Sequence, residues 1–233
     1  MMLNGNIGNV VISMAIPSVI AYIINSVYSL TDTYFVSTIG ESATAAVGVN
    51  SSLDTFVFLF STAIAVGSNS YVSRLLGAKD KEKASTVLST SFFSTVVVGI
   101  VLMLIGLTFM GPMITLFGAT DTCREYAIQY ARYVLLVAPF TCATSLMTFC
   151  LRGEGHATMS MIGTTAGAVV NIGLDPLFIS VLGLGVAGAS MATAISKIVS
   201  FLVLFFPYLL KKTQLVISIR KFRFDLKIYG EIL

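Results

Sequence analysis

Long stretches without a charged side chain recur along this sequence, and they restrict its fold more than any other feature. Residues 1–31 contain no Asp, Glu, Lys or Arg, and neither do residues 55–73 and 84–120. An α-helix rises about 1.5 Å per residue, so roughly 20 apolar residues cross the hydrocarbon core of a bilayer. Repeated runs of this length predict a chain that crosses a membrane several times.

The composition excludes several other classes of protein. Of the 233 residues, 56% are hydrophobic and only 11% are charged, and the mean hydropathy is +0.91. A soluble domain carries roughly 25% charged residues. These values exclude a soluble enzyme, a nucleic-acid-binding domain and a disordered chain. We therefore expect no nucleic-acid partner, and membrane lipids as the surroundings of the chain.

The pattern predicts an all-α integral membrane fold with six spans. We place them at residues 10–36, 52–72, 86–109, 127–150, 157–181 and 186–209. Residues 1–210 then form one six-helix lobe, and residues 211–233 form a basic linker. The first apolar run is too long and too poor in cleavage signals for a secretory signal peptide.

Basic residues predict the orientation in the membrane, because they concentrate on the cytoplasmic side. With the N-terminus inside, the cytoplasmic loops would be residues 73–84, 151–156 and the tail from residue 211. These segments hold most of the 14 basic residues, namely Arg74, Lys79, Lys81, Lys83, Arg152, Lys211, Lys212, Arg220, Lys221, Arg223 and Lys227. We expect both termini to be cytoplasmic.

Three ionisable residues stand out at membrane depth in the expected spans: Asp32, Asp175 and Lys197. Each costs about 2.5–3.5 kcal/mol at membrane depth, so each is a candidate functional residue. Asn171 precedes Asp175 by four residues, and Thr193 precedes Lys197 by four, so the members of each pair share a helix face.

Four of these polar residues lie at similar depths. At about 1.5 Å per residue, Asp32 lies roughly 6 Å and Asp175 roughly 9 Å from the outer ends of their helices. Thr193 lies roughly 10 Å and Asn171 roughly 15 Å from that side. If the three helices are neighbours, these oxygens converge on a site suited to Na⁺, or to a pair of protonatable acids.

Prolines add to this interpretation. Pro176 cannot donate to the carbonyl of Ile172, so it frees a backbone oxygen between Asn171 and Asp175. Broken helices of this kind hold coupling ions in transporters. Pro17 and Pro139 are expected to bend the first and fourth helices. Two alternatives stay open: Asp175 and Pro176 mark only a helix end, and Asp32 lies at the water interface without a ligand.

Lys197 has three possible roles: it lines an aqueous cavity, pairs with an acid, or reaches towards the interface. Asn25 in the first span is a further candidate for a cavity-facing position. Glycines at 163, 167, 183, 185 and 188 are expected to permit close helix contact. The sequence shows no nucleophile–base pair, phosphate loop or Cys/His cluster, so we expect neither an enzyme nor a cofactor.

Several motifs, in order and on the expected spans, resemble one known family. Residues 73–80 (Ser-Arg-Leu-Leu-Gly-Ala-Lys-Asp) resemble the second cytoplasmic-side motif of the multidrug and toxic compound extrusion (MATE) transporters. Residues 151–155 (Leu-Arg-Gly-Glu-Gly) resemble the loop after their fourth helix. Residues 171–179 and 185–193 resemble their fifth and sixth helices, and residues 16–17 and 31–33 resemble their first helix.

This resemblance implies a particular fold and activity. MATE transporters have two six-helix lobes around a central cavity, and this chain resembles the N-terminal lobe of the DinF-like or prokaryotic type. Carried over by motif, Asp32, Asn171, Asp175 and Thr193 would form a cation site, with Na⁺ or H⁺ as the coupling ion. Pro17 would be a helix bend that responds to the ion. The partners implied are amphipathic, cationic drugs and a C-terminal lobe.

We therefore expect multidrug efflux by cation-coupled antiport across the cell membrane, in which this chain supplies the N-terminal lobe. One alternative is a flippase for lipid-linked substrates from the same superfamily, although a lone Lys197 offers little positive charge for a pyrophosphate. Another alternative is a truncated lobe that does not transport.

Overall fold

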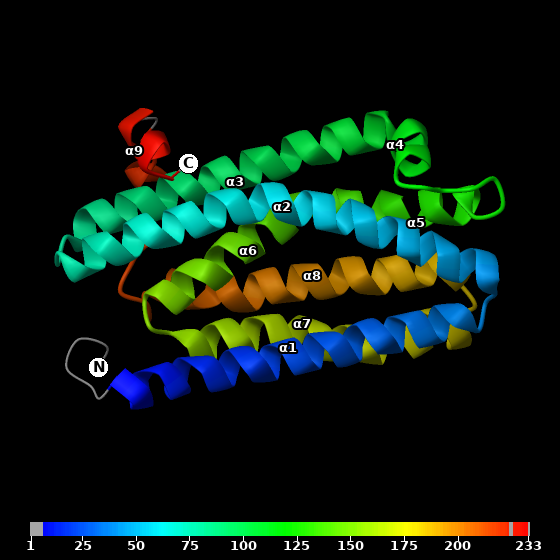
Figure 1. The fold of residues 1–233 in the computed structure, drawn as a ribbon, viewed down its shortest axis with the longest axis horizontal. Helices are drawn as coiled ribbons and strands as arrows, with labels where there is room; N and C mark the ends of the chain where they lie inside the picture. Colours follow the sequence, from blue (N-terminus) through cyan, green and yellow to red (C-terminus); the bar gives the residue numbers. More distant parts are fainter. Residues whose placement is uncertain (1–6, 224–225, 233) are drawn as a thin grey trace.

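The computed structural model describes residues 7–223 and 226–232, which form an all-helical bundle (Figure 1). Its long helices run almost parallel or antiparallel to one axis. Five of the described segments are long and apolar enough to cross a membrane. They are α1 (Ile7–Ser37), α2 (Glu41–Gly77), α3 (Lys81–Thr108), α7 (Ala157–Pro176) with the π-helix η1 (Leu177–Val181), and α8 (Gly185–Leu209).

A sixth possible span is bent. After the short helix α4 (Met110–Leu116), α5 (Arg124–Leu136) and α6 (Ala138–Gly153) meet at an angle of 56° and are together long and apolar enough for one span. The break lies next to Pro139, which confirms the expected bend in this helix. Gly99 of α3 lies against the break: a Cβ atom there would lie 2.5 Å from the Cα atom of Pro139.

The bundle has two ends that differ in their turns. The start of α1 and the turn between α2 and α3 lie at the same end (Figure 1). In that turn Lys79 adopts a left-handed φ of 64°, and the side chain of Asp80 caps α3 by accepting from the backbone N–H of Lys83 at 3.0 Å. The N-cap satisfies one of the unpaired N–H groups of the helix. The turn between α4 and α5 lies at the opposite end.

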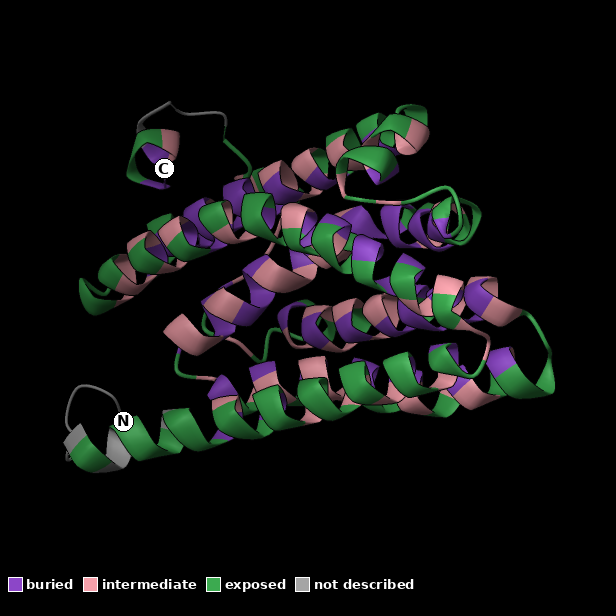
Figure 2. Cartoon of the chain, turned by 45° about the vertical axis from the view of Figure 1, so that its right-hand side comes forward, coloured by how far each residue is buried: buried purple, intermediate pink, exposed green. Residues whose placement is uncertain are grey.

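Helix α7 packs between α1 and α8, while α2 packs against α3 and α6. Figure 2 shows buried residues on the sides of the helices that face their neighbours, whereas α1 is largely exposed. On α1, Tyr22 is 69% and Leu30 is 71% exposed. Exposed apolar side chains of this kind suit contact with lipid or with another apolar protein surface.

Small residues set the spacing between α7 and α8. A Cβ atom on Gly167 would lie 2.6 Å from the carbonyl oxygen of Ser196 and would also collide with the side chain of Ser200. Gly163 and Gly188 are similarly close to Leu204 and Phe178, which confirms the expected close contacts at these three glycines.

Gly183 and Gly185 behave differently from the expectation. Both adopt left-handed φ values, of 61° and 58°, in the turn between η1 and α8, and no atom lies within 4 Å of a Cβ built on either. The expectation of helix contact was wrong for this pair. Their role is the backbone conformation of the turn, which other residues rarely adopt.

The segment after α8 returns along the bundle to α3. The backbone N–H of Ser218 donates to Ser89 Oγ at 3.1 Å, and that of Val216 donates to Ser85 Oγ at 3.4 Å. The 3₁₀ turn η2 (Ile219–Lys221) and helix α9 (Leu226–Ile232) follow. Positions 224–225 and 233 of the expected linker lie outside the described residues.

Candidate functional site

The four residues predicted to bind a cation come from three helices that pack together. Asp32 lies on α1, Asn171 and Asp175 lie on α7, and Thr193 lies on α8. Their exposed fractions are 5%, 0%, 0% and 1% respectively. The structure therefore buries all four at the junction of α1, α7 and α8. We call them the acidic cluster.

Asn171 connects α7 to α8 within this cluster. In the amide orientation that gives both the nitrogen and the oxygen a hydrogen-bond partner, the nitrogen donates to Asp175 Oδ2 at 2.8 Å. Its oxygen then accepts from the backbone N–H of Thr193 at 3.2 Å and lies 3.4 Å from Thr193 Oγ1. The spacing of four residues between Asn171 and Asp175 makes this contact possible, because such residues are neighbours on a helix.

Two tyrosines complete the surroundings of Asp32. The hydroxyl of Tyr130, on α5, interacts with the carboxyl group of Asp32 and lies 3.4 Å from Thr193 Oγ1. Tyr28, one turn before Asp32 on α1, also interacts with Thr193. Within residues 7–223 and 226–232, however, Asp32 Oδ1 is buried without a hydrogen-bond partner.

An unpartnered carboxylate oxygen indicates what the acidic cluster can do. Asp32 and Asp175 interact electrostatically, so their charges repel one another when both are ionised. Burial makes this arrangement costly unless a cation or a proton neutralises it. Carboxylate, amide and hydroxyl oxygens are ligands that hard cations prefer. These donors therefore fit either Na⁺ or an exchangeable proton.

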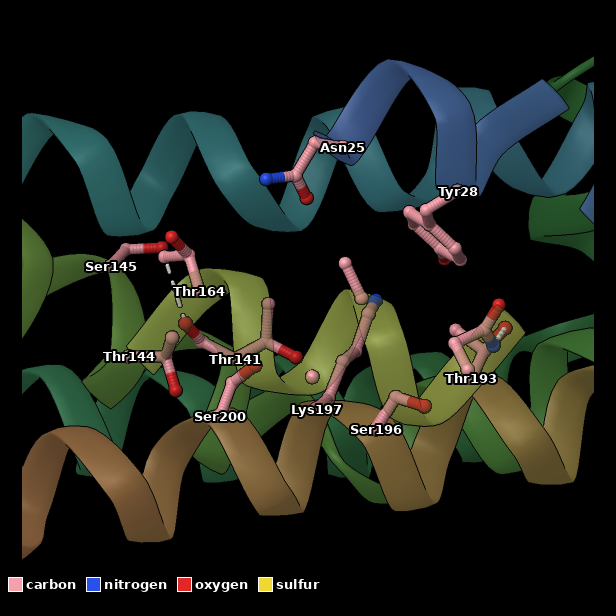
Figure 3. A pocket seen from close by; sticks show the side chains of 13 residues that line it. Asn25, Tyr28, Thr141, Thr144, Ser145, Thr164, Thr193, Ser196, Lys197 and Ser200 are labelled. Carbon is pink, nitrogen blue, oxygen red and sulfur yellow. Dashed lines mark hydrogen bonds between the residues drawn. The ribbon is translucent and has the colours of Figure 1, made fainter. Parts of the chain in front are cut away.

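A cavity of about 170 Å³ adjoins the acidic cluster (Figure 3). Asn171 and Thr193 belong to both, so the two are continuous. Most of the other polar lining side chains carry hydroxyl groups, and Lys197 supplies a positive charge. The polar residues of the wall are Asn25, Tyr28, Thr141, Thr144, Ser145, Thr164, Asn171, Thr193, Ser196, Lys197 and Ser200.

The two candidates for cavity-facing positions lie at this cavity. Asn25 lines it from α1, and its amide donates to the carbonyl oxygen of Ala21 at 2.8 Å. Lys197 lines it from α8, and its Nζ atom lies 2.7 Å from Asp54 Oδ1 of α2. Two of the open roles for Lys197 thus apply together: it lines a cavity and pairs with an acid.

The two predicted bends lie at different distances from the acidic cluster. Pro17 is buried within α1, fifteen residues before Asp32. Pro176 is the last residue of α7, and the chain continues from it as the π-helix η1. The change of helix type follows directly after Pro176, which agrees with the loss of a backbone donor at this residue.

Sequence reasoning missed Tyr28, Tyr130 and Asp54. Placing a tyrosine at membrane depth costs little free energy, so nothing in the sequence marks either tyrosine as a functional residue. Asp54 did offer a signal, because it is ionisable. It was overlooked because the expected span began at residue 52, whereas α2 begins at Glu41 and places Asp54 thirteen residues inside the helix.

Known proteins are similar to this chain in both sequence and fold. The family model described as MatE matches residues 17–177. The multidrug export protein MepA of Staphylococcus aureus (strain MRSA252) is 30% identical over 204 residues, which is 87% of this chain and 45% of MepA. The chain thus spans about half the length of this curated relative.

Solved structures of transporters have the same fold as this chain. A MOP superfamily transporter from Pyrococcus furiosus superposes with a TM-score of 0.92 at 31% identity, covering 99% of this chain and 51% of that chain. A MATE protein in its straight conformation gives the same TM-score and identity, covering 99% and 52%. Because the family model covers more than half of the sequence, the chain belongs to the MatE family of multi-pass membrane proteins.

Proposed function

We propose that this chain supplies the cation-binding lobe of an antiporter that exports drugs from the cell. The observation that carries the proposal is the acidic cluster. Its two carboxylates, Asp32 and Asp175, are buried at membrane depth, and its other two members, Asn171 and Thr193, also line a polar cavity. The similarity to a multidrug export protein supports efflux as the activity. The coupling ion would be Na⁺ or H⁺.

The arrangement suggests how an ion and a drug compete. A ligand shifts a conformational equilibrium only by its different affinity for the two states. An ion held by Asp32 and Asp175 would favour the state in which these carboxylates lie close together. Asn171 and Thr193 would transmit this preference, because they belong to the acidic cluster and also line the cavity.

The helix bends have a place in this proposal. Pro17 removes one backbone hydrogen bond from α1, the helix that carries Asp32 and Tyr28. A helix weakened at this point can bend at low cost, and bending would change the distance between Asp32 and α7. The proposed substrates are amphipathic cations. A second lobe would cover the cavity on the side that is open in this chain.

The test is efflux of ethidium from cells that express the full open reading frame. We expect Asp32→Asn and Asp175→Asn each to lower the efflux rate at least tenfold at equal membrane abundance. Asp121→Asn, which changes an exposed acid, is the matched control and should retain the rate. Variants that pump like the wild type would show that the acidic cluster is not the coupling site.

Imposed gradients in inverted vesicles identify the ion. Drug uptake driven by a Na⁺ gradient at constant pH indicates Na⁺, and uptake driven by a pH gradient without Na⁺ indicates H⁺. A wild type that moves no drug under either gradient would contradict the efflux proposal for this chain. It would favour a lobe that does not transport, or a flippase for lipid-linked substrates.

A further inference from the structure

The segment after α8 carries a large excess of positive charge. Residues 211–223, which we call the basic strap, contain no acidic side chain and five basic ones, namely Lys211, Lys212, Arg220, Lys221 and Arg223. None of these five side chains forms an ion pair with a residue in the described part of the chain. Their charge is therefore available to a partner outside the protein.

Contacts with the bundle hold the basic strap in place at both ends. Leu215, near its start, is fully buried in the apolar core. Further along, the backbone N–H of Ser218 donates to Ser89 Oγ at 3.1 Å, and that of Arg223 donates to Thr90 Oγ1 at 3.2 Å. Folding thus orders the backbone that carries the charges, so a ligand does not have to supply the free energy for this step.

The basic strap lies near the membrane surface on the side that the basic loops predict to be cytoplasmic. It begins directly after α8, a membrane-length helix that ends at Leu209, and α9, which follows it, lies beside α3 (Figure 1). Its contacts on α3, from Ser85 to Thr90, are roughly 6–14 Å from the start of this helix at Lys81. The 28 residues of α3 span about 42 Å, which exceeds the hydrocarbon core by about 12 Å. The contacts therefore lie at the level of the lipid headgroups.

The exposed side chains of the basic strap are of two kinds. Ile219 is 75% and Phe222 is 39% exposed, although the ring of Phe222 also contacts that of Phe93. Arg220 and Arg223, each next to one of these apolar residues, are exposed as well. Segments at a membrane surface combine such residues, because the apolar side chains enter the acyl boundary while Lys and Arg bind anionic headgroups. An acidic soluble protein would pair with the charges but would leave Ile219 without an apolar environment.

We propose that the basic strap is a binding site for anionic phospholipids of the cytoplasmic leaflet. Arg220, Lys221 and Arg223 contact the phosphate of the headgroup, and Ile219 and Phe222 lie among the upper parts of the acyl chains. The site selects lipids with a net negative charge over zwitterionic ones, because the strap offers cations and no carboxylate. This inference does not depend on the proposed function, since it uses neither the acidic cluster nor the cavity.

The experiment uses the absence of tryptophan from the sequence, because a single introduced tryptophan then reports on its own surroundings. Ile219→Trp places the reporter in the basic strap. Leu116→Trp, at an exposed position of α4, places it at the opposite end of the bundle. The full chain is reconstituted in bilayers of phosphatidylcholine and phosphatidylglycerol with brominated acyl chains, which quench nearby tryptophan. We expect phosphatidylglycerol to be preferred at least threefold at residue 219, and neither lipid to be preferred at residue 116.

Variants in the Ile219→Trp background identify the groups responsible. Arg220→Gln, Lys221→Gln and Arg223→Gln together should abolish the preference for phosphatidylglycerol. The pair Arg220→Lys and Arg223→Lys keeps the charge and should keep the preference. Arg124→Gln with Arg132→Gln, which removes two exposed charges from α5, is the matched control and should also leave it unchanged.

Three results would overturn the proposal. Equal preference at residues 219 and 116 would show that the basic strap selects no lipid, and would favour an acidic soluble protein as its partner. A preference that survives the triple Gln substitution would exclude the three basic side chains as its cause. Loss of the preference on addition of inorganic phosphate at constant ionic strength would indicate a site for free anions. Efflux of ethidium is measured separately, so failure of the efflux proposal leaves this test unaffected.

Discussion

Glu154 is a buried carboxyl group at the end of α6, with an exposed fraction of 5%. Its Oε1 atom accepts from the hydroxyl of Tyr208 at 2.9 Å, and its Oε2 atom accepts from the backbone N–H of Gln214 at 3.0 Å. One side chain therefore connects the turn after α6 to the end of α8 and to the segment that follows it. Burial raises the pKa of Glu154 to about 7, although these hydrogen bonds oppose the rise.

This pKa predicts how stability depends on pH. The unfolded carboxyl loses its proton near pH 4.5 and the folded one near pH 7, so the folded state holds an extra proton between these values. The stabilisation is complete below about pH 4.5 and is lost as the pH rises through about 7, by at most about 3 kcal/mol.

Glu154→Gln should remove this dependence. Melting temperatures of the purified protein in detergent, measured at pH 5 and pH 8, should differ less for Glu154→Gln than for the wild type. Asp121→Asn, an exposed acid, should behave like the wild type. An equal difference in the wild type and in Glu154→Gln would contradict the assignment.

At the scale of helices, the contact between α7 and α8 positions the candidate site, because it brings Asn171 against Thr193. Gly167 lies against the backbone of Ser196 and the side chain of Ser200. Gly167→Ala should therefore push the helices apart and cost about 1–3 kcal/mol, as overpacking does in other cores.

Gly173→Ala is the matched control, since it lies on the same helix and no atom is within 4 Å of the position that its added methyl group would occupy. It should be neutral or slightly stabilising, because alanine favours helix more than glycine. Thermal unfolding and ion binding of the two variants check this. Equal melting temperatures would show that α7 and α8 adjust without cost.

For the whole molecule, the basic loops predict which end of the bundle faces the cytoplasm. The start of α1 and the turn between α2 and α3 lie at one end, and the turn between α4 and α5 lies at the other (Figure 1). Cys123, Cys142 and Cys150 are free and buried, so labelling of native thiols should be low.

Cysteines introduced at the two ends test the orientation. In intact cells, a maleimide that cannot cross the membrane should label Asp121→Cys, whereas it should label Lys81→Cys only after lysis. The reverse pattern would place the basic loops outside and would make both predicted termini extracellular.

The sequence alone determined the membrane class and the four residues of the acidic cluster. Both follow from properties of residue types, since apolar runs have a required length and polar groups in hydrocarbon have a high cost. Asp32, Asn171, Asp175 and Thr193 therefore stood out before any contact was known. Their role in binding an ion stays a prediction.

Only the tertiary structure decided which of these groups touch, and what surrounds them. Asp54 and Lys197 are 143 residues apart, and no helical spacing relates one to the other. The place of Tyr130 beside Asp32 and the turn conformations of Gly183 and Gly185 depend on how helices pack and connect. Spacing within a helix defines its faces, but the packing of side chains between helices determines which faces meet.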